Sequence, residues 1–224
     1  MKTKRLSFKS AGFTIVELMI ASVVFSLVLV LITYGVIRFN QAYYGGVVQT
    51  ATQNVARSVI DSVTQGIQLN GGEVAQLTPV AGWSGVCVGN QFYQFQQGKQ
   101  LYKGTASPGP NQVSQAMILE PDVSSCSGQT PGATVKGTEM LGEHMRLANL
   151  TVSSISGTSL YKVNVRVVYG DDELLCAQSV SGSCSSPSST AGATATDAQC
   201  KSGTGTPQFC AVSDLSTTVQ KRIN

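Results

Sequence analysis

Few side chains in this sequence have the types and spacing that chemistry requires. The 224 residues include one histidine, His144, so a site of several histidines is excluded. No Gly-x-Ser-x-Gly turn accompanies this imidazole, which favours a surface or packing role over catalysis. The segment Asp171-Asp172-Glu173 offers carboxylate oxygens to calcium, although a solvated turn is the more frequent role of such a segment. We therefore expect no catalytic residue, no cofactor and at most a weak calcium site.

The most informative titratable residue is Glu17, because it lies inside an apolar segment. The chain stays apolar from Phe13 to Ile37, a run of about 25 residues that would span about 37 Å as a helix and cross a bilayer core of about 30 Å. A carboxylate inside such a span raises the free energy of membrane insertion by on the order of 2.5–3.5 kcal/mol. No base lies within one helical turn of it. Glu17 therefore either reaches the headgroups or has a partner elsewhere.

Charges on the two sides of the apolar segment predict its orientation. Four bases without an acid precede it, namely Lys2, Lys4, Arg5 and Lys9, and Arg38 closely follows it. The positive-inside rule then places the N-terminus in the cytoplasm and the residues after 38 outside. A secretory signal peptide fits less well, since its apolar region is about 7–15 residues long. The remaining bases do not outnumber the 12 acids, so we expect no binding to nucleic acid.

The six cysteines all follow the apolar segment. They are Cys87, Cys126, Cys176, Cys184, Cys200 and Cys210. An even number on the exported side favours disulfides, and their spacing lacks a paired Cys-x-x-Cys zinc pattern. Pairing Cys176 with Cys210 and Cys184 with Cys200 would close the Ser- and Gly-rich loop 178–208 and leave Cys87 for Cys126. Crossed pairings among the last four cysteines remain open.

The apolar segment predicts a helix that continues beyond the membrane. Residues 36–69 lack proline and carry apolar side chains at helical spacings, such as Val59 and Val63. Gly45-Gly46 is a weak point at which we expect a bend or local unwinding. Asn70-Gly71-Gly72 is a typical end for a helix.

Beyond residue 73 the composition changes to short β-rich segments separated by turns. We expect strands over residues 85–88, 91–95, 100–102, 116–119, 147–155, 160–169 and 209–219. Val163, Val165 and Val167 alternate with polar residues in the longest of these strands. This alternation predicts an antiparallel sheet with one packed side and one side that faces water.

The junction Lys9-Ser10-Ala11-Gly12-Phe13-Thr14-Ile15-Val16-Glu17-Leu18 resembles the class III signal of type IV prepilins and pseudopilins. That resemblance implies that a prepilin peptidase cuts between Gly12 and Phe13 and methylates the new amine of Phe13. It also implies that Glu17 pairs with the cationic N-terminus of a neighbouring subunit, which gives the carboxylate its partner in the assembled array. The implied fold is α+β and pilin-like: a long N-terminal helix packed on a C-terminal antiparallel sheet with disulfide-stapled loops.

The exported half is similar to PilW-type minor pilins and to J-type minor pseudopilins of type II secretion. The similar segments are Met145-Arg146-Leu147, the strand 161–169 with Gly170-Asp171-Asp172 after it, and the final segment 215–219. The domain organisation that follows is a leader (1–12), a transmembrane and assembly helix (13–37), an amphipathic continuation (38–70) and an exported β-rich domain (71–224).

The function expected from these features is that of a non-enzymatic minor pilin that primes or caps a type IV filament. Its expected partners are the prepilin peptidase, other major and minor pilins, membrane lipid before assembly, and an inner-membrane platform with its motor ATPase. The chain itself lacks a nucleotide-binding loop. We expect it in the bacterial inner membrane, with a periplasmic C-terminal domain, and then in the surface pilus. Two alternatives stay open: a minor pseudopilin of type II secretion, and a tip adhesin or DNA-uptake subunit whose ligand surface is the 178–208 loop.

Overall fold

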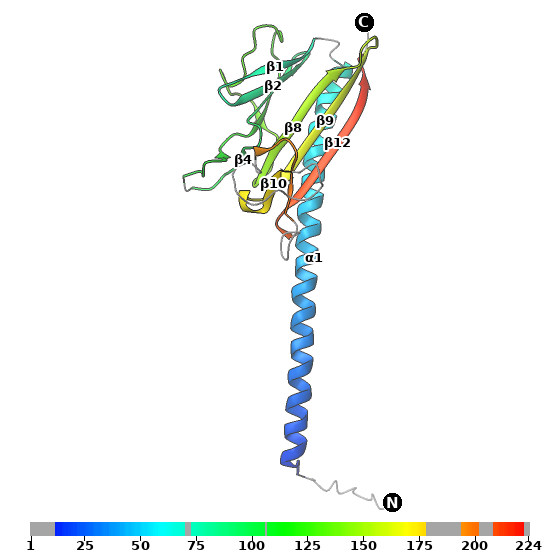
Figure 1. Cartoon of the computed structure of the whole chain (residues 1–224), viewed down its shortest axis with the longest axis vertical. Coiled ribbons are helices and arrows are strands. Elements are labelled where there is room, and N and C mark those ends of the chain that lie inside the picture. Colours follow the sequence, from blue (N-terminus) through cyan, green and yellow to red (C-terminus); the bar gives the residue numbers. More distant parts are fainter. Residues whose placement is uncertain (1–11, 70–72, 106, 178–193, 202–207, 222–224) are drawn as a thin grey trace, which may run out of the picture. The chain divides into compact units, whose positions relative to one another are not determined.

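The computed structural model of the chain describes residues 12–69, 73–105, 107–177, 194–201 and 208–221 (Figure 1). The contacts of the chain divide it into two units, Met1–Gln41 and Ala42–Asn224, which we describe separately. The first unit contains the N-terminal part of helix α1 (Ile15–Leu69), and the second contains its C-terminal part and every strand.

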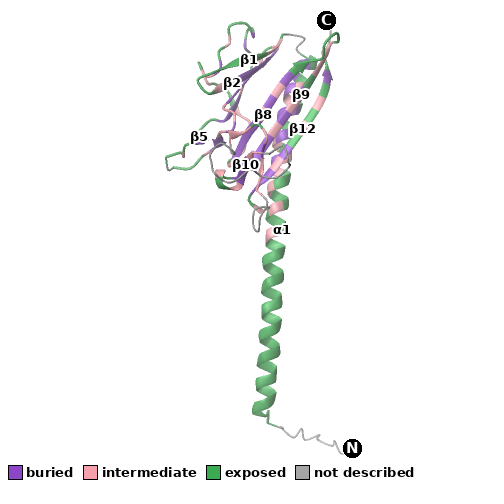
Figure 2. Ribbon diagram, in the orientation of Figure 1, coloured by how far each residue is buried: buried purple, intermediate pink, exposed green. Residues whose placement is uncertain are grey.

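In the first unit, α1 exposes its apolar side chains. Large hydrophobic residues from Ile15 to Phe39 are exposed, and none of the described residues of this unit is buried (Figure 2). Among the described elements, α1 is the one helix that is long and apolar enough to cross a membrane. This agrees with the apolar run in the sequence.

In the second unit, α1 buries one face at helical spacing. Its buried residues are Thr52, Ala56, Val59, Ile60, Val63, Gly66 and Ile67, which recur every three or four positions as an amphipathic helix requires. The helix ends at Leu69, immediately before the predicted stop. The unwinding expected at Gly45-Gly46 is wrong, because both glycines are helical and the Thr50 hydroxyl donates to the Gly46 carbonyl at 2.8 Å. A glycine costs only about 1 kcal/mol in a helix, which a long helix tolerates.

The strands form two five-stranded sheets and one small hairpin-like pair. The first sheet has the order β1-β2-β3-β6-β7 and consists of β1 (Val74–Val80), β2 (Trp83–Val88), β3 (Gln91–Phe95), β6 (Met117–Glu120) and β7 (Thr138–Glu139). The second has the order β12-β9-β8-β4-β5 and consists of β12 (Ala211–Gln220), β9 (Leu160–Tyr169), β8 (Met145–Ser154), β4 (Gln100–Leu101) and β5 (Gln112–Val113). The 3-10 helix η1 (Asp172–Leu174) leads into the pair β10 (Leu175–Ala177) and β11 (Ala198–Cys200).

Both sheets share one hydrophobic core with the C-terminal part of α1. Helix residues such as Val59 and Val63 pack with Tyr93 of the first sheet and Val165 of the second. The pilin-like α+β fold expected from the sequence is therefore present. Two details differ from the expectation of a single antiparallel sheet with a wet outer side. There are two sheets, and β4 pairs with β5 in parallel.

The outer side of the second sheet is covered at one end rather than fully exposed to water. Ala148 of β8 and Val168 of β9 are buried against Leu175 of β10 and Ala198 of β11. The sequence pattern did not predict this cover, because β10 and β11 are only three residues long and β11 lies within residues 178–208, which were expected to form a loop.

Two disulfides join described cysteines. Cys87 pairs with Cys126, which is the pairing expected from the sequence. Cys200 pairs with Cys210, so the expected pairs Cys176–Cys210 and Cys184–Cys200 are wrong. The reason is topological: Cys200 ends β11 and Cys210 directly precedes β12, so a short connection returns the chain to the sheet. Cys176 is also disulfide-bonded, whereas Cys184 lies outside the described residues.

Candidate processing and assembly site

The junction before α1 is built as a capping box. Thr14 is the residue before the first helical residue, and its hydroxyl accepts a hydrogen bond from the Glu17 amide at 3.2 Å. In return, Glu17 Oε2 accepts hydrogen bonds from the Thr14 amide at 2.9 Å and from the Thr14 hydroxyl at 2.8 Å. A Thr-x-x-Glu pair of this geometry satisfies two amides that a helix start leaves without an intrahelical partner.

Thr14 is a functional residue that the analysis of the sequence missed. The sequence contains the signature of a capping box at this position. This signature is a Ser or Thr that is followed three residues later by Glu and then by an apolar run. A cationic partner was expected for Glu17, whereas its partner within the chain is a threonine. In the described part of the chain, both donors reach the Oε2 atom of Glu17 and Oε1 has none. The carboxylate thus keeps one oxygen for a second partner.

Gly12 and Phe13 precede this capping box in an exposed, non-helical segment. Phe13 is 82% exposed. A Cβ placed on Gly12 would meet nothing within 4 Å, so the fold itself does not require glycine at this position. A glycine that packing does not explain suits recognition of the backbone by an external enzyme.

The polar side chains of the apolar part of α1 bond to the helix itself. The hydroxyls of Ser22, Ser26 and Thr33 donate to carbonyls three or four residues earlier, each at 2.8 Å. Such bonds hide hydroxyl groups from a hydrocarbon environment, where water cannot satisfy them. Arg38 donates from Nε to the Tyr34 hydroxyl at 3.1 Å, a pair of the kind found at a membrane interface.

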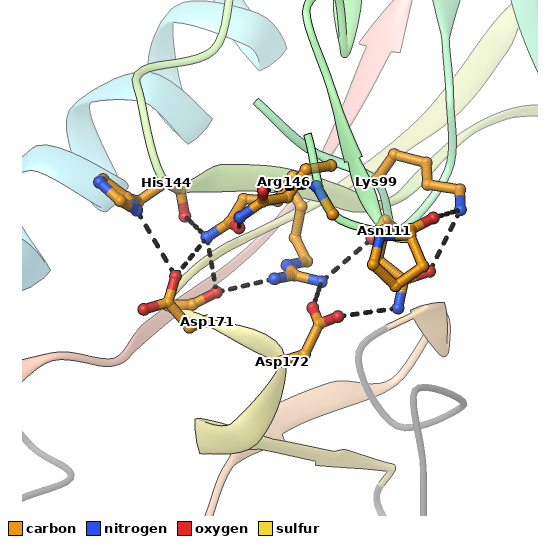
Figure 3. A network of polar contacts seen from close by, with 12 residues as sticks. Lys99, Asn111, His144, Arg146, Asp171 and Asp172 are labelled. Atoms are coloured by element: carbon orange, nitrogen blue, oxygen red, sulfur yellow. Dashed lines mark hydrogen bonds and ion pairs between the residues drawn. The ribbon is translucent and has the colours of Figure 1, made fainter. Parts of the chain in front are cut away.

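The acidic segment after β9 belongs to a network around a buried arginine (Figure 3). Arg146 is fully buried, and its Nη1 donates to Asp172 Oδ1 at 2.7 Å and to the Gly98 carbonyl at 3.2 Å. Its Nη2 donates to the Gly170 carbonyl at 2.8 Å. Burial lowers the pKa of Arg146, and the hydrogen bond that Arg146 donates to Asp172 opposes that shift. The network joins β8, the turn before η1 and the turn before β4.

These contacts leave the Asp171-Asp172-Glu173 segment poorly suited to calcium. Asp172 Oδ2 accepts from Asn111 Nδ2 at 2.8 Å while Oδ1 binds Arg146, so both of its oxygens have donors. Asp171 Oδ1 accepts from Gln100 Nε2 at 3.0 Å. Across the ranges that the structure describes, no group of three or more His, Cys, Asp or Glu side chains is placed to hold a metal ion. The two aspartates serve a structural network instead.

His144 lies at the edge of the same network. Its Nδ1 is 3.5 Å from Asp171 Oδ1, and its backbone has a positive φ of 62°. The backbone of His144 accepts from the Gly170 amide and donates to the Leu101 carbonyl, both at 3.1 Å. These bonds hold the turn before β8, in keeping with a packing role. The 178–208 loop proposed as a ligand surface lies largely outside the described residues.

Comparison with known proteins identifies the N-terminal segment. A family model described as the prokaryotic N-terminal methylation motif matches residues 7–33. No curated protein and no solved structure matches the chain. The chain therefore carries the prepilin-type cleavage and methylation signal typical of type IV pilins and pseudopilins. The fold, in which the C-terminal part of a long helix packs on disulfide-bonded antiparallel sheets, is pilin-like.

Proposed function

We propose that the chain is a minor pilin that primes or caps assembly of a type IV pilus. The observation that carries this proposal is the junction: a methylation motif over residues 7–33 whose Gly12 is not required by packing, followed by a capping box and an exposed apolar helix. The proposed domains are the leader 1–12, the membrane and assembly helix 13–37, its amphipathic continuation 38–70 and the exported domain 71–224.

In this proposal the prepilin peptidase cuts between Gly12 and Phe13 and methylates the amine of Phe13. The helix then anchors the subunit in the inner membrane, with the cysteine-containing domain in the periplasm. Disulfides such as Cys87–Cys126 support the proposed periplasmic location of this domain, because disulfides persist in oxidising compartments. A platform with a motor ATPase extracts the subunit, and its apolar helix exchanges lipid for the helices of other pilins.

Glu17 has two successive partners in this scheme. In the separate chain its Oε2 caps the helix through Thr14. In the filament, its other oxygen receives the cationic amine of Phe13 from a neighbouring subunit, which neutralises the carboxylate in a low-dielectric setting. The capping box supports this role because it holds the carboxylate beside the very start of the helix.

The experiment that tests the minor-pilin role is gene deletion with complementation in the native bacterium. We expect the deletion to reduce the number of surface pili, leave secretion of exoproteins intact, and be reversed by the wild-type gene. The converse result, intact pili with impaired secretion, would assign the chain to a type II pseudopilus. Normal pili that have lost adhesion or DNA uptake would assign it a binding role at the tip.

A further inference from the structure

One long sheet edge of this protein lacks the features that usually protect sheet edges. Of the other described edges in the two five-stranded sheets, β5 and β7 are two residues long, and β1 contains Pro79 and a register shift between Leu77 and Val80. The remaining edge, β12, pairs with β9 over ten successive residues without a shift. It contains neither proline nor lysine, and its one charged residue, Asp214, is paired with Arg166 of β9. Natural proteins normally blunt such an edge with a proline, a bulge, a lysine or a short strand.

The register shows which amides of β12 point away from the sheet. The Lys221 amide donates to the Ser159 carbonyl at 2.9 Å, in continuation of the β12–β9 ladder. Since antiparallel bonding alternates along a strand, the odd-numbered residues of β12 bond to β9. The even-numbered residues, Val212, Asp214, Ser216, Thr218 and Gln220, direct their amides and carbonyls outward. Within the described chain, these outward groups have no hydrogen-bond partner.

A groove runs along this edge. Its volume is about 290 Å³, and it lies between residues 215–219 of β12 and residues 57–68 of α1. Ile60, Leu215 and Val219 provide an apolar floor, whereas Arg57 and Asp61 on α1 provide one positive and one negative charge. The groove therefore has an apolar floor, a balanced pair of charges, and a row of unpaired backbone groups on one side.

We propose that β12 receives an extended segment of another protein, which adds one antiparallel strand to the second sheet. The outward amides and carbonyls supply the hydrogen bonds of strand addition, and alternate side chains of the guest reach the apolar floor. The guest is a neutral segment in which β-branched apolar residues alternate with Ser or Thr. A second copy of this chain fits less well, because its β12 lies beside its own α1 and the groove of about 290 Å³ does not accommodate a second helix.

Hydrogen exchange of the mature full-length chain in detergent micelles tests this proposal. The probe is a blocked, neutral eight-residue peptide in which valine and threonine alternate. With the peptide, we expect exchange at Asp214, Ser216 and Thr218 to slow by about fivefold or more, the effect of one added hydrogen bond. Exchange at Leu215 and Thr217, which already bond to β9, should not change.

Two half-methylated peptides serve as the matched control. One carries N-methyl groups on its valines and the other on its threonines, so each has one edge that cannot donate. Strand addition uses one edge, so one of the two peptides should retain the protection and the other should lose it. Equal behaviour of the two peptides would overturn the proposal. Protection that is already present without peptide and rises with protein concentration would also overturn it and would indicate a second copy.

A pair of variants at the same position gives an independent readout. Thr218→Pro removes an outward amide that β9 does not use, so we expect the chain to fold and the peptide effect at Ser216 to disappear. Thr218→Val keeps the amide and should retain the effect. An unchanged peptide effect in a folded Thr218→Pro chain would contradict strand addition. The peptide control stands on the wild-type chain and is informative even where the proline variant fails to fold.

Discussion

At the scale of single residues, the Thr14–Glu17 pair gives the N-terminal motif a physical meaning within one chain. The threonine and the glutamate reciprocally satisfy the first turn of α1 before any neighbour is present. A carboxylate in this position also interacts favourably with the positive end of the helix dipole. The motif therefore combines a local helix start with the proposed contact between subunits, and these two roles can be separated by substitution.

Glu17→Gln separates them, because glutamine at this position still accepts hydrogen bonds in a capping box but carries no charge. We expect normal membrane insertion and normal cleavage after Gly12, with incorporation into filaments strongly reduced. Loss of one partner of a buried ion pair costs about 3–5 kcal/mol. The measurements are membrane fractionation and co-purification of the processed variant with other pilins.

Thr14→Ala is the control for this prediction. It removes the cap, at a cost of about 1 kcal/mol, but keeps the charge of Glu17. We expect it to assemble better than Glu17→Gln. If Glu17→Gln instead enters filaments at the wild-type level, Glu17 serves the helix start alone and the proposed pairing with a neighbour is wrong.

The buried Arg146 predicts a large effect on stability. Arg146→Met leaves Asp172 without its cation, removes the Arg146 donor to the Gly98 carbonyl and leaves the Gly170 carbonyl with Gln100 Nε2 as a donor. We expect the free energy of unfolding of the second unit to fall by about 3–5 kcal/mol, measured by urea unfolding of the chain in detergent. Arg166→Met is the matched control, because its partner Asp214 is 56% exposed. If Arg146→Met and Arg166→Met lower the free energy of unfolding by the same amount, burial of Arg146 does not explain the effect.

At the scale of elements, Tyr93 joins α1 to the first sheet. Its hydroxyl lies 2.9 Å from the Ser62 hydroxyl of α1 and donates to Gln91 Oε1 at 2.9 Å. Burial raises the pKa of Tyr93 to about 12, although the hydrogen bond with Ser62 opposes the shift. The folded state therefore holds this proton more tightly than the unfolded chain, in which tyrosine titrates near pH 10.

This raised pKa predicts a loss of stability at high pH. The contribution of the neutral phenol is complete below about pH 10 and is lost as the pH rises toward 12, at roughly 3 kcal/mol in total. Tyr93→Phe should be less stable than the wild type by about 1 kcal/mol at pH 8, because it loses its hydrogen bonds. Its stability should decline less between pH 10 and 12. Urea unfolding at a series of pH values measures both effects. If the stabilities of the wild type and Tyr93→Phe decline in parallel between pH 10 and 12, Tyr93 does not cause the loss of stability.

The Cys200–Cys210 disulfide secures the return of the chain from β11 to β12 across a separation of 10 residues. Replacing both cysteines with serine should lower the free energy of unfolding by about 3 kcal/mol, the loop-closure value for a ring of this size. Mapping of disulfide-linked peptides under non-reducing conditions checks the connectivity itself. Recovery of a Cys176–Cys210 peptide in its place would show that the nested pairing expected from the sequence was right.

The elements that the sequence predicted are those with a sustained pattern. Helix α1 and the long strands β8, β9 and β12 follow from their periodicity, and their boundaries agree within a few residues. Five strands were missed: β1, β5, β7, β10 and β11. Of these, β1 contains a proline, which is unfavourable in a strand, and the other four are two or three residues long and carry no period. Cys200–Cys210 was missed for the same reason: its pairing depends on where β11 lies. The Thr-x-x-Glu pattern in the sequence predicts Thr14 as the capping partner of Glu17, but the sequence interpretation considered only charged partners.

At the scale of the whole molecule, the two units have different tasks in the proposed function. The first contains the proposed processing site and an apolar helix, and the second is a folded domain with its own core and disulfides. In the proposed assembly, a free, methylated Phe13 amine of one subunit is the partner of Glu17 of a neighbouring subunit. Processing between Gly12 and Phe13 is therefore the central claim.

Mass spectrometry of the N-terminus, after coexpression with a prepilin peptidase, tests this claim most directly. We predict a mature chain that begins at Phe13 and carries one added methyl group on its amine. Gly12→Val should block cleavage, because a side chain at the cut obstructs close approach of the enzyme to the backbone, whereas Ala11→Val should be cleaved normally. A wild-type chain that keeps Met1, or that is cut within or after the apolar helix, would contradict the account.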